Sequence, residues 1–166
     1  MDVPCGDCVA CCSSSQFVHI APDETEALAH IPKALLFPVP FAPKGHVLLG
    51  YDEHGRCPVL VDGGCSIYEH RPRTCRTYDC RVFAATGIGP DPDKPAIVRQ
   101  AARWRFTYDT PEDRELARAA QDAARFVAGG DDARALAVTA TQHAVLAMEL
   151  AHHFDASSPD VEGARV

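Results

Sequence analysis

The sequence has no cysteine after residue 80, and it has no apolar run near the ~18 residues that a membrane-spanning helix needs. The first residues, Met-Asp-Val-Pro-Cys, have neither the basic start nor the apolar stretch of a secretory signal. We therefore expect a cytoplasmic protein that does not enter a membrane and whose thiols are kept reduced.

Several catalytic patterns are also missing. The sequence contains no glycine-rich phosphate loop, no Ser–His–Asp pattern and no pair of carboxylates in a recognisable context. Nothing therefore favours a hydrolase or a nucleotide-dependent enzyme, and whether the protein is an enzyme stays open. The composition is otherwise ordinary, with 46% hydrophobic and 23% charged residues, so most of the chain is expected to fold.

What the sequence does contain is eight cysteines among its first 80 residues, in two clusters. They are Cys5, Cys8, Cys11 and Cys12, followed by Cys57, Cys65, Cys75 and Cys80. Thiolates are preferred ligands of zinc and of iron–sulfur centres, so all eight are predicted metal ligands. Four disulfides, with 105 possible pairings, are the alternative, but they would require an oxidising compartment.

The spacing of the first cluster bears on the number of metals. A Cys-x2-Cys turn easily places two sulfurs on one tetrahedral zinc. Adjacent side chains such as those of Cys11 and Cys12 point in different directions, so they favour a multinuclear centre or two nearby metals. Spacing does not separate two zinc ions from an iron–sulfur cluster, because both use such cysteine patterns.

Charge is distributed unevenly along the chain. Residues 71–105 carry eight basic and three acidic residues, although the whole chain has a net charge of −7. Guanidinium groups near a metal–thiolate centre would offset its negative charge. A nucleic-acid interface is the weaker interpretation, since both flanking regions are acidic.

Local signals outline the first half of the chain. We expect a strand at residues 17–20, a helix over 22–30 and an irregular proline-rich loop over 32–45. Residues 46–51 and 57–61 are predicted to pair as a hairpin across the turn Asp52–Gly55. Pro72 is expected to open a short helix that carries Cys75.

These signals predict an α+β fold, in which a cysteine-rich domain with a short antiparallel sheet precedes a helical hairpin. Thr110 and Pro111 mark the start of one helix, which should end near Gly129, and a second helix should run from Asp131 to about His153. Residues 97–108 are compatible with either a strand or a helix. The predicted organisation is residues 1–83 for the metal-binding domain, 84–108 for a connector packed on it, 109–155 for the hairpin and 156–166 for a flexible tail.

Histidines and tyrosines near the cysteines are weaker candidates. His19, His46 and His70 could complete a mixed site, but eight cysteines already supply enough ligands. Tyr68 and Tyr78 are expected to be packed rings with satisfied hydroxyl groups. His143, His152 and His153 fall on the last predicted helix, where cationic side chains near the C-terminus interact favourably with the helix dipole.

The joint pattern resembles a known family. Cys5-x2-Cys8-x2-Cys11-Cys12, followed by Cys57-Pro58 and Cys65-Ser-Ile-Tyr68-x2-Arg71-Pro72-x2-Cys75-Arg76-x-Tyr78-x-Cys80, is similar to the bacterial cysteine-cluster family with a zinc- or iron-chelating CxxCxxCC domain. The resemblance covers residues 4–83 and implies a metal centre. Flagellin lysine methylases are similar in this cysteine motif, so the resemblance does not fix a reaction.

Two arginines of the motif, Arg71 and Arg76, are expected to hydrogen-bond the sulfurs of the centre or the carbonyls around them. Binding of an anionic substrate is their alternative role. The leading functional hypothesis is a cytoplasmic metal-binding protein whose folding is coupled to its metal. The alternatives are an iron–sulfur enzyme or redox component, with protein modification as a candidate role, and, more weakly, a zinc module binding nucleic acid through residues 71–105. A protein partner is left open.

Overall fold

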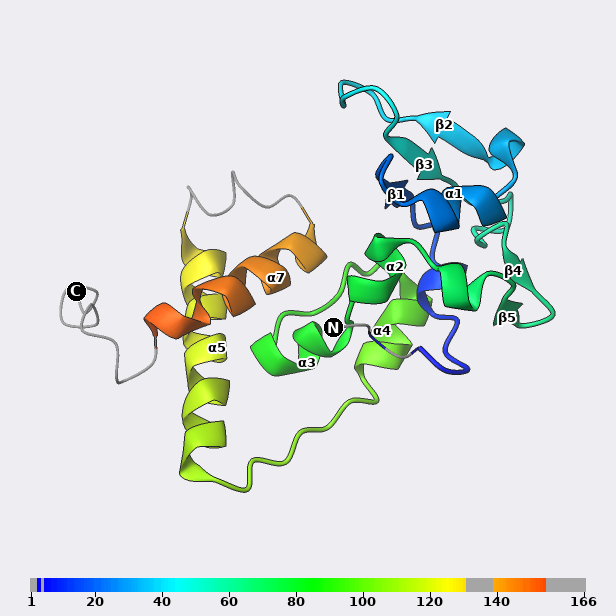
Figure 1. The fold of residues 1–166 in the computed structure, drawn as a ribbon. Helices are drawn as coiled ribbons and strands as arrows, with labels where there is room; N and C mark the ends of the chain where they lie inside the picture. The colour runs from blue at the N-terminus through cyan, green and yellow to red at the C-terminus, as the bar shows by residue number, and fades with distance from the viewer. Residues whose placement is uncertain (1–2, 4, 131–138, 155–166) are drawn as a thin grey trace. The chain divides into compact units, whose positions relative to one another are not determined.

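The computed structural model describes residues 3, 5–130 and 139–154 (Figure 1). The chain divides into two compact units, residues 1–79 and residues 80–166. Helices and small antiparallel sheets make up the described residues, so the predicted α+β class is confirmed. No helix among these residues is long and apolar enough to cross a membrane.

A three-stranded antiparallel sheet organises the first unit (Figure 1). Its strands are β1 (Val18–Ile20), β3 (Val47–Leu49) and β2 (Leu36–Pro38), in that order. In the central strand β3, Leu49 pairs with Val18 of β1 on one side and with Leu36 of β2 on the other. Val18 and Leu49 are buried, so one face of the sheet lies on the core.

The predicted pairing of residues 46–51 with 57–61 is wrong. β3 pairs with β1 and β2, whereas β4 (Leu60–Val61) pairs with β5 (Gly64–Cys65). The turn residues explain the difference: Asp62 and Gly63 both have positive φ, at 50° and 79°, as a tight two-residue hairpin turn requires. This turn folds β4 back onto its immediate successor. β3 pairs instead with β1 and with β2, and β2 lies in the segment 32–45 that was predicted to be an irregular loop.

Short helices complete the first unit. They are α1 (Thr25–His30), α2 (Arg73–Thr77) and three 3-10 turns at Cys11–Ser13, Lys33–Leu35 and Tyr68–His70. α1 begins later than predicted, at Thr25, and it ends before Pro32 because a proline disfavours helical conformation in the residue before it. Pro72 precedes α2 directly, as the sequence predicted.

The core of the first unit is small and includes cysteines. Three partly buried cysteines pack against its apolar side chains: Cys57, Cys65 and Cys75. The buried apolar residues are Val18, Ile20, Ala27, Ile31, Leu49, Val59 and Ile67. Three of the four metal-ligand candidates of the second cluster are thus held by the same core that holds the sheet.

The second unit is helical. It contains α3 (Arg81–Thr86), α4 (Pro95–Ala101), α5 (Pro111–Gly129) and α7 (Ala140–Leu150), which a 3-10 turn at Ala151–His153 extends. The start of α5 is as predicted, and α4 shows that the undecided segment begins as a helix. The predicted start of the last helix, at Asp131, lies outside the described residues.

Small side chains form the contact between α5 and α7 (Figure 1). Ala123 and Ala124 of α5 are buried with Val127, and Ala147 of α7 is fully buried in the same cluster. Alanines let two helix backbones approach closely. Each of the two helices begins with a capping box, at Thr110 for α5 and at Thr139 for α7.

Candidate metal centre

A tight turn shapes the first cysteine cluster. The backbone N–H of Cys8 donates to the carbonyl of Cys5 at 3.0 Å, and Gly6 between them has a positive φ of 54°. Glycine adopts this left-handed conformation without a steric cost. The turn curls Cys5 and Cys8 toward one another, and the 3-10 turn that starts at Cys11 follows it directly.

Two backbone hydrogen bonds then connect this cluster to the second one. The N–H of Cys57 donates to the carbonyl of Cys12 at 2.7 Å, and the N–H of Ser15 donates to the carbonyl of Gly55 at 2.8 Å. Gly55 has a φ of +73°, and a Cβ at this position would collide with the Ser15 side chain. The close approach of the two segments therefore depends on a glycine here.

The remaining cysteines of the first unit come from β5 and α2. Cys65 lies opposite Leu60 in the β4–β5 hairpin. Cys75 lies in α2, which is fixed to β1 by a hydrogen bond from the Thr74 hydroxyl to the carbonyl of His19, at 2.7 Å. The carbonyl of Arg76 also accepts from the N–H of Val3 at 2.7 Å, so α2 is held against the N-terminal segment.

The thiols of both clusters lie close enough to influence one another's ionisation. Burial raises the pKa of the Cys12 thiol to about 12, and four neighbouring thiolates contribute to the rise: Cys57, Cys65, Cys5 and Cys8. Burial likewise raises the pKa of Cys75 to about 12, with contributions from Cys12, Cys57, Cys65 and Cys5. Six of the predicted ligands are therefore neighbours in space.

This donor set fits a metal that prefers sulfur. Several half-buried thiols that oppose one another's ionisation can all become thiolates only if a cation lies among them. None of the eight cysteines is joined in a disulfide. Zinc and iron–sulfur centres are the groups that take such a ligand set.

Arg71 and Tyr68 lie against the first cluster. One Arg71 Nη atom donates to the Cys5 sulfur at 3.3 Å and to the carbonyl of Val3 at 3.4 Å. The guanidinium also lies over the Tyr68 ring, 3.8 Å from its centroid, and the Tyr68 hydroxyl accepts from the N–H of Gly6 at 3.3 Å. A positive charge therefore lies beside a predicted ligand, where it would offset the negative charge of a metal–thiolate centre.

Comparison with protein families adds a decisive observation. Residues 4–104 match the family described as "CxxCxxCC: Putative zinc- or iron-chelating domain". The chain belongs to the CxxCxxCC family. The match covers more than half of the 166 residues and includes all eight cysteines, so the predicted resemblance is confirmed. Comparison with curated proteins and with solved structures gives no match.

Cys11 and Cys80 are the two remaining predicted ligands. Cys11 is the first residue of the 3-10 turn in which Cys12 is the second. Cys80 belongs to the second unit, where it precedes α3 and its sulfur accepts a hydrogen bond from the Trp104 indole N–H at 3.3 Å. That both cysteines are ligands stays a prediction.

The histidines suggested for a mixed site interact mainly with one another. His19 Nε2 lies 2.9 Å from His46 Nδ1, so the two rings share a hydrogen bond. His70 stacks on His30, with ring centroids 3.6 Å apart. Neither contact involves a cysteine, so sulfur remains the proposed ligand chemistry of the CxxCxxCC centre.

One important residue was missed by the sequence analysis. Glu24 accepts from the N–H of Ala21 through one carboxylate oxygen, at 2.9 Å, and from the N–H of Arg73 through the other. It therefore joins the start of α1 to the start of α2, the helix that carries Cys75. A carboxylate at a helix N-terminus is favoured electrostatically, but no sequence pattern shows that it comes from 49 residues away.

Proposed function

We propose that this protein is a cytoplasmic metal-binding protein whose first unit holds zinc or iron through cysteine thiolates. The observation that carries the proposal is the set of thiols around Cys12 and Cys75. Their high pKa values mean that ionised sulfurs are costly there unless a cation neutralises them. A bound metal supplies that charge, and membership of a zinc- or iron-chelating family agrees with it.

The number of neighbouring thiols supports more than one metal ion. A tetrahedral zinc takes four ligands, and six thiols interact electrostatically here. Two zinc ions that share or divide these thiolates would use all of them. The chain's part in this function is to supply the sulfurs, to hold them with the Cys12–Cys57 backbone contact and to place Arg71 beside Cys5.

We also propose that metal binding is coupled to the folding of the first unit. Its strands contain only two or three residues, and its apolar core consists of seven buried side chains. Elements this short bury little apolar area each, so cross-links through a metal would contribute a large part of the stability.

Elemental analysis of anaerobically purified protein, together with its visible spectrum, tests the identity of the metal. A colourless protein with about two zinc ions per chain would support the proposal, because eight thiolates can be divided into two groups of four. Protein that contains no metal after anaerobic purification and binds none when Zn²⁺ or Fe²⁺ is added would contradict it.

An iron–sulfur redox component is the second candidate. The hydrogen bond from Arg71 to the Cys5 sulfur favours it, since such bonds to ligand sulfurs tune the reduction potential of a cluster. A brown protein with iron and acid-labile sulfide would select this candidate over zinc. The Arg71→Lys variant should then shift the potential while leaving iron content unchanged, because lysine keeps the charge but not the planar fork.

A further inference from the structure

A second group of metal-binding side chains lies in the first unit, outside the cysteine clusters. Glu26 and His30 stand one turn apart in α1, and His70 ends the 3-10 turn Tyr68–His70, which contacts α1. The nearest ligand atoms of these three residues, one carboxylate oxygen and two ring nitrogens, all lie within 4.8 Å of one another. None of the three belongs to the CxxCxxCC pattern.

One nitrogen of the His30 ring is occupied by a backbone hydrogen bond. Its Nδ1 lies 2.8 Å from the backbone carbonyl of Glu26. A carbonyl can only accept, so Nδ1 carries the hydrogen, and in the neutral ring Nε2 keeps its lone pair. Metal-binding histidines are commonly fixed in this way, with one ring nitrogen donating to a carbonyl and the other facing the ion.

The ring of His70 faces the Glu26 carboxylate. Its Nδ1 is 3.9 Å from Glu26 Oε2, which is too long for a hydrogen bond. Two ligand atoms on one tetrahedral zinc are ~3.3 Å apart, so the Glu26–His70 pair needs only a small approach. The His30 and His70 rings are stacked with their planes 9° apart, so they would also have to rotate until their in-plane lone pairs meet at the ion. Both side chains have room to rotate, since 40% of the His70 side chain and 80% of the Glu26 side chain are exposed.

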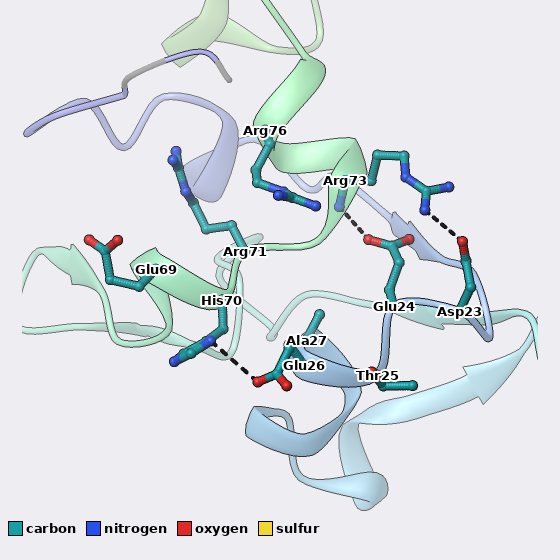
Figure 2. A pocket seen from close by; sticks show the side chains of 10 residues that line it. All are labelled: Asp23, Glu24, Thr25, Glu26, Ala27, Glu69, His70, Arg71, Arg73 and Arg76. Carbon is teal, nitrogen blue, oxygen red and sulfur yellow. Dashed lines mark hydrogen bonds and ion pairs between the residues drawn. The ribbon is translucent and has the colours of Figure 1, made fainter. Parts of the chain in front are cut away.

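We propose that Glu26, His30 and His70 bind a divalent transition-metal ion, with zinc as the best match, at a site separate from the cysteines. Two imidazoles and one carboxylate are a ligand set that zinc accepts, and three protein ligands leave a fourth position for water. Glu26 and His70 also line a cavity of about 270 Å³, in which their side chains face one another (Figure 2).

The charges around this cavity do not oppose a cation. Its lining includes four carboxylates and three guanidinium groups, and the carboxylates are Asp23, Glu24, Glu26 and Glu69. Arg73 is paired with Asp23 at 2.8 Å, as Figure 2 shows, and Arg71 donates to the Cys5 sulfur. Two of the positive groups are therefore compensated by partners of their own, while Glu26 remains directed at the histidines.

The experiment is a titration of untagged protein, purified with its thiolate-bound metal, with Zn²⁺. Calorimetry measures the number of added ions bound, and NMR follows the Cε1 protons of the histidines. We expect one additional Zn²⁺ per chain, with the His30 and His70 signals shifting together. His30→Gln and His70→Gln should each weaken this binding at least about tenfold, since even loss of a group that only orients a ligand costs that much.

His54→Gln is the matched control. His54 Nε2 lies 3.8 Å from Glu53 Oε1, nearly the same separation, but this exposed pair belongs to no group of three such ligands among the described residues. We expect it to leave the additional binding unchanged. Circular dichroism and the thiolate-bound metal content of each variant show whether the first unit is still folded.

The spectrum of bound Co²⁺ distinguishes this site from the cysteine centre. Co²⁺ bound to thiolates gives a sulfur-to-metal charge-transfer band, whereas Co²⁺ at the Glu26–His30–His70 site gives none. The proposal is overturned if no additional ion binds, if the binding survives both histidine variants, or if His54→Gln weakens it equally. None of these results changes the number of metals held by cysteines.

Discussion

The two units of this chain reach a folded state by different means. In the first unit, segments far apart in sequence meet through a few contacts, such as the hydrogen bond from Cys57 to Cys12 and the one from Thr74 to His19. In the second unit, α5 alone has 19 residues, and α5 and α7 each start with a capping box. Local interactions stabilise such helices, whereas the first unit depends on long-range links. We therefore expect bound metal to stabilise the fold of the first unit and to have little effect on the fold of the second.

Removal of the metal should produce the largest effect. With a chelator and a reductant present, we expect residues 5–79 to lose hydrogen-exchange protection, because the thiolate centre holds their short elements together. α5 and α7 should keep their protection, since their contact contains no cysteine. Hydrogen exchange with mass spectrometry measures both units in one sample. An equal loss of protection in both units, or no loss in either, would show that metal does not stabilise the first unit selectively.

A single ligand substitution should have the next largest effect. Cys12→Ser removes the sulfur that four other thiolates surround, so we expect a clear loss of bound metal and of protection in the first unit. Cys80→Ser changes a cysteine of the second unit that contacts Trp104, and we expect it to lose less metal. Metal analysis of the two purified variants makes the comparison. An identical loss would mean that the centre does not depend mainly on the first unit.

Metal affinity should rise steadily with pH. Without metal, the thiols of Cys12 and Cys75 are protonated near pH 7 whether or not the first unit is folded. Burial raises their pKa to about 12 in the folded unit, and an exposed thiol has a pKa of about 8.5. Binding as thiolates then releases at least these two protons, and protons compete less as the pH increases. Competition with a coloured chelator at about pH 6.5, 7.5 and 8.5 measures how much the metal affinity changes with pH. A flat profile would rule out these two sulfurs as ligands.

A core substitution in the second unit should have the smallest effect and should not change metal content. Val127 is fully buried against α7, and Val127→Ala removes two methyl groups, which costs about 2 kcal/mol of unfolding free energy. Val145→Ala is the matched control, because the Val145 side chain is 43% exposed. Chemical denaturation measures stability, and metal analysis of the same samples tests independence. A drop in bound metal with Val127→Ala would link the two units.

Local signals explain what the sequence could predict. Thr110 and Pro111 marked the start of α5, and Pro72 marked the start of α2, because caps and prolines act within one turn of the chain. The cysteines were identified as candidate ligands from residue type and spacing alone. Each of these predictions rests on residues close together in sequence.

Long-range contacts explain what the sequence could not. The pairing of β3 with β2, the carboxylate of Glu24 on the start of α2 and the stacking of His30 on His70 all join distant segments. A strand pattern indicates that a segment pairs but not with which partner. Glutamate and histidine in surface positions are common, so neither residue type indicated that Glu26, His30 and His70 would meet.

The backbone contact between Cys12 and Cys57 has a consequence for the newly synthesised protein. Cys57, the first cysteine of the second cluster, follows Cys12 by 45 positions, so at ~5–20 residues per second the ribosome needs roughly 2–9 s between them. Throughout that interval the first four thiols have no partners from the second cluster. The order of translation thus sets the earliest moment of metal loading, and it leaves the youngest chains dependent on a reducing environment.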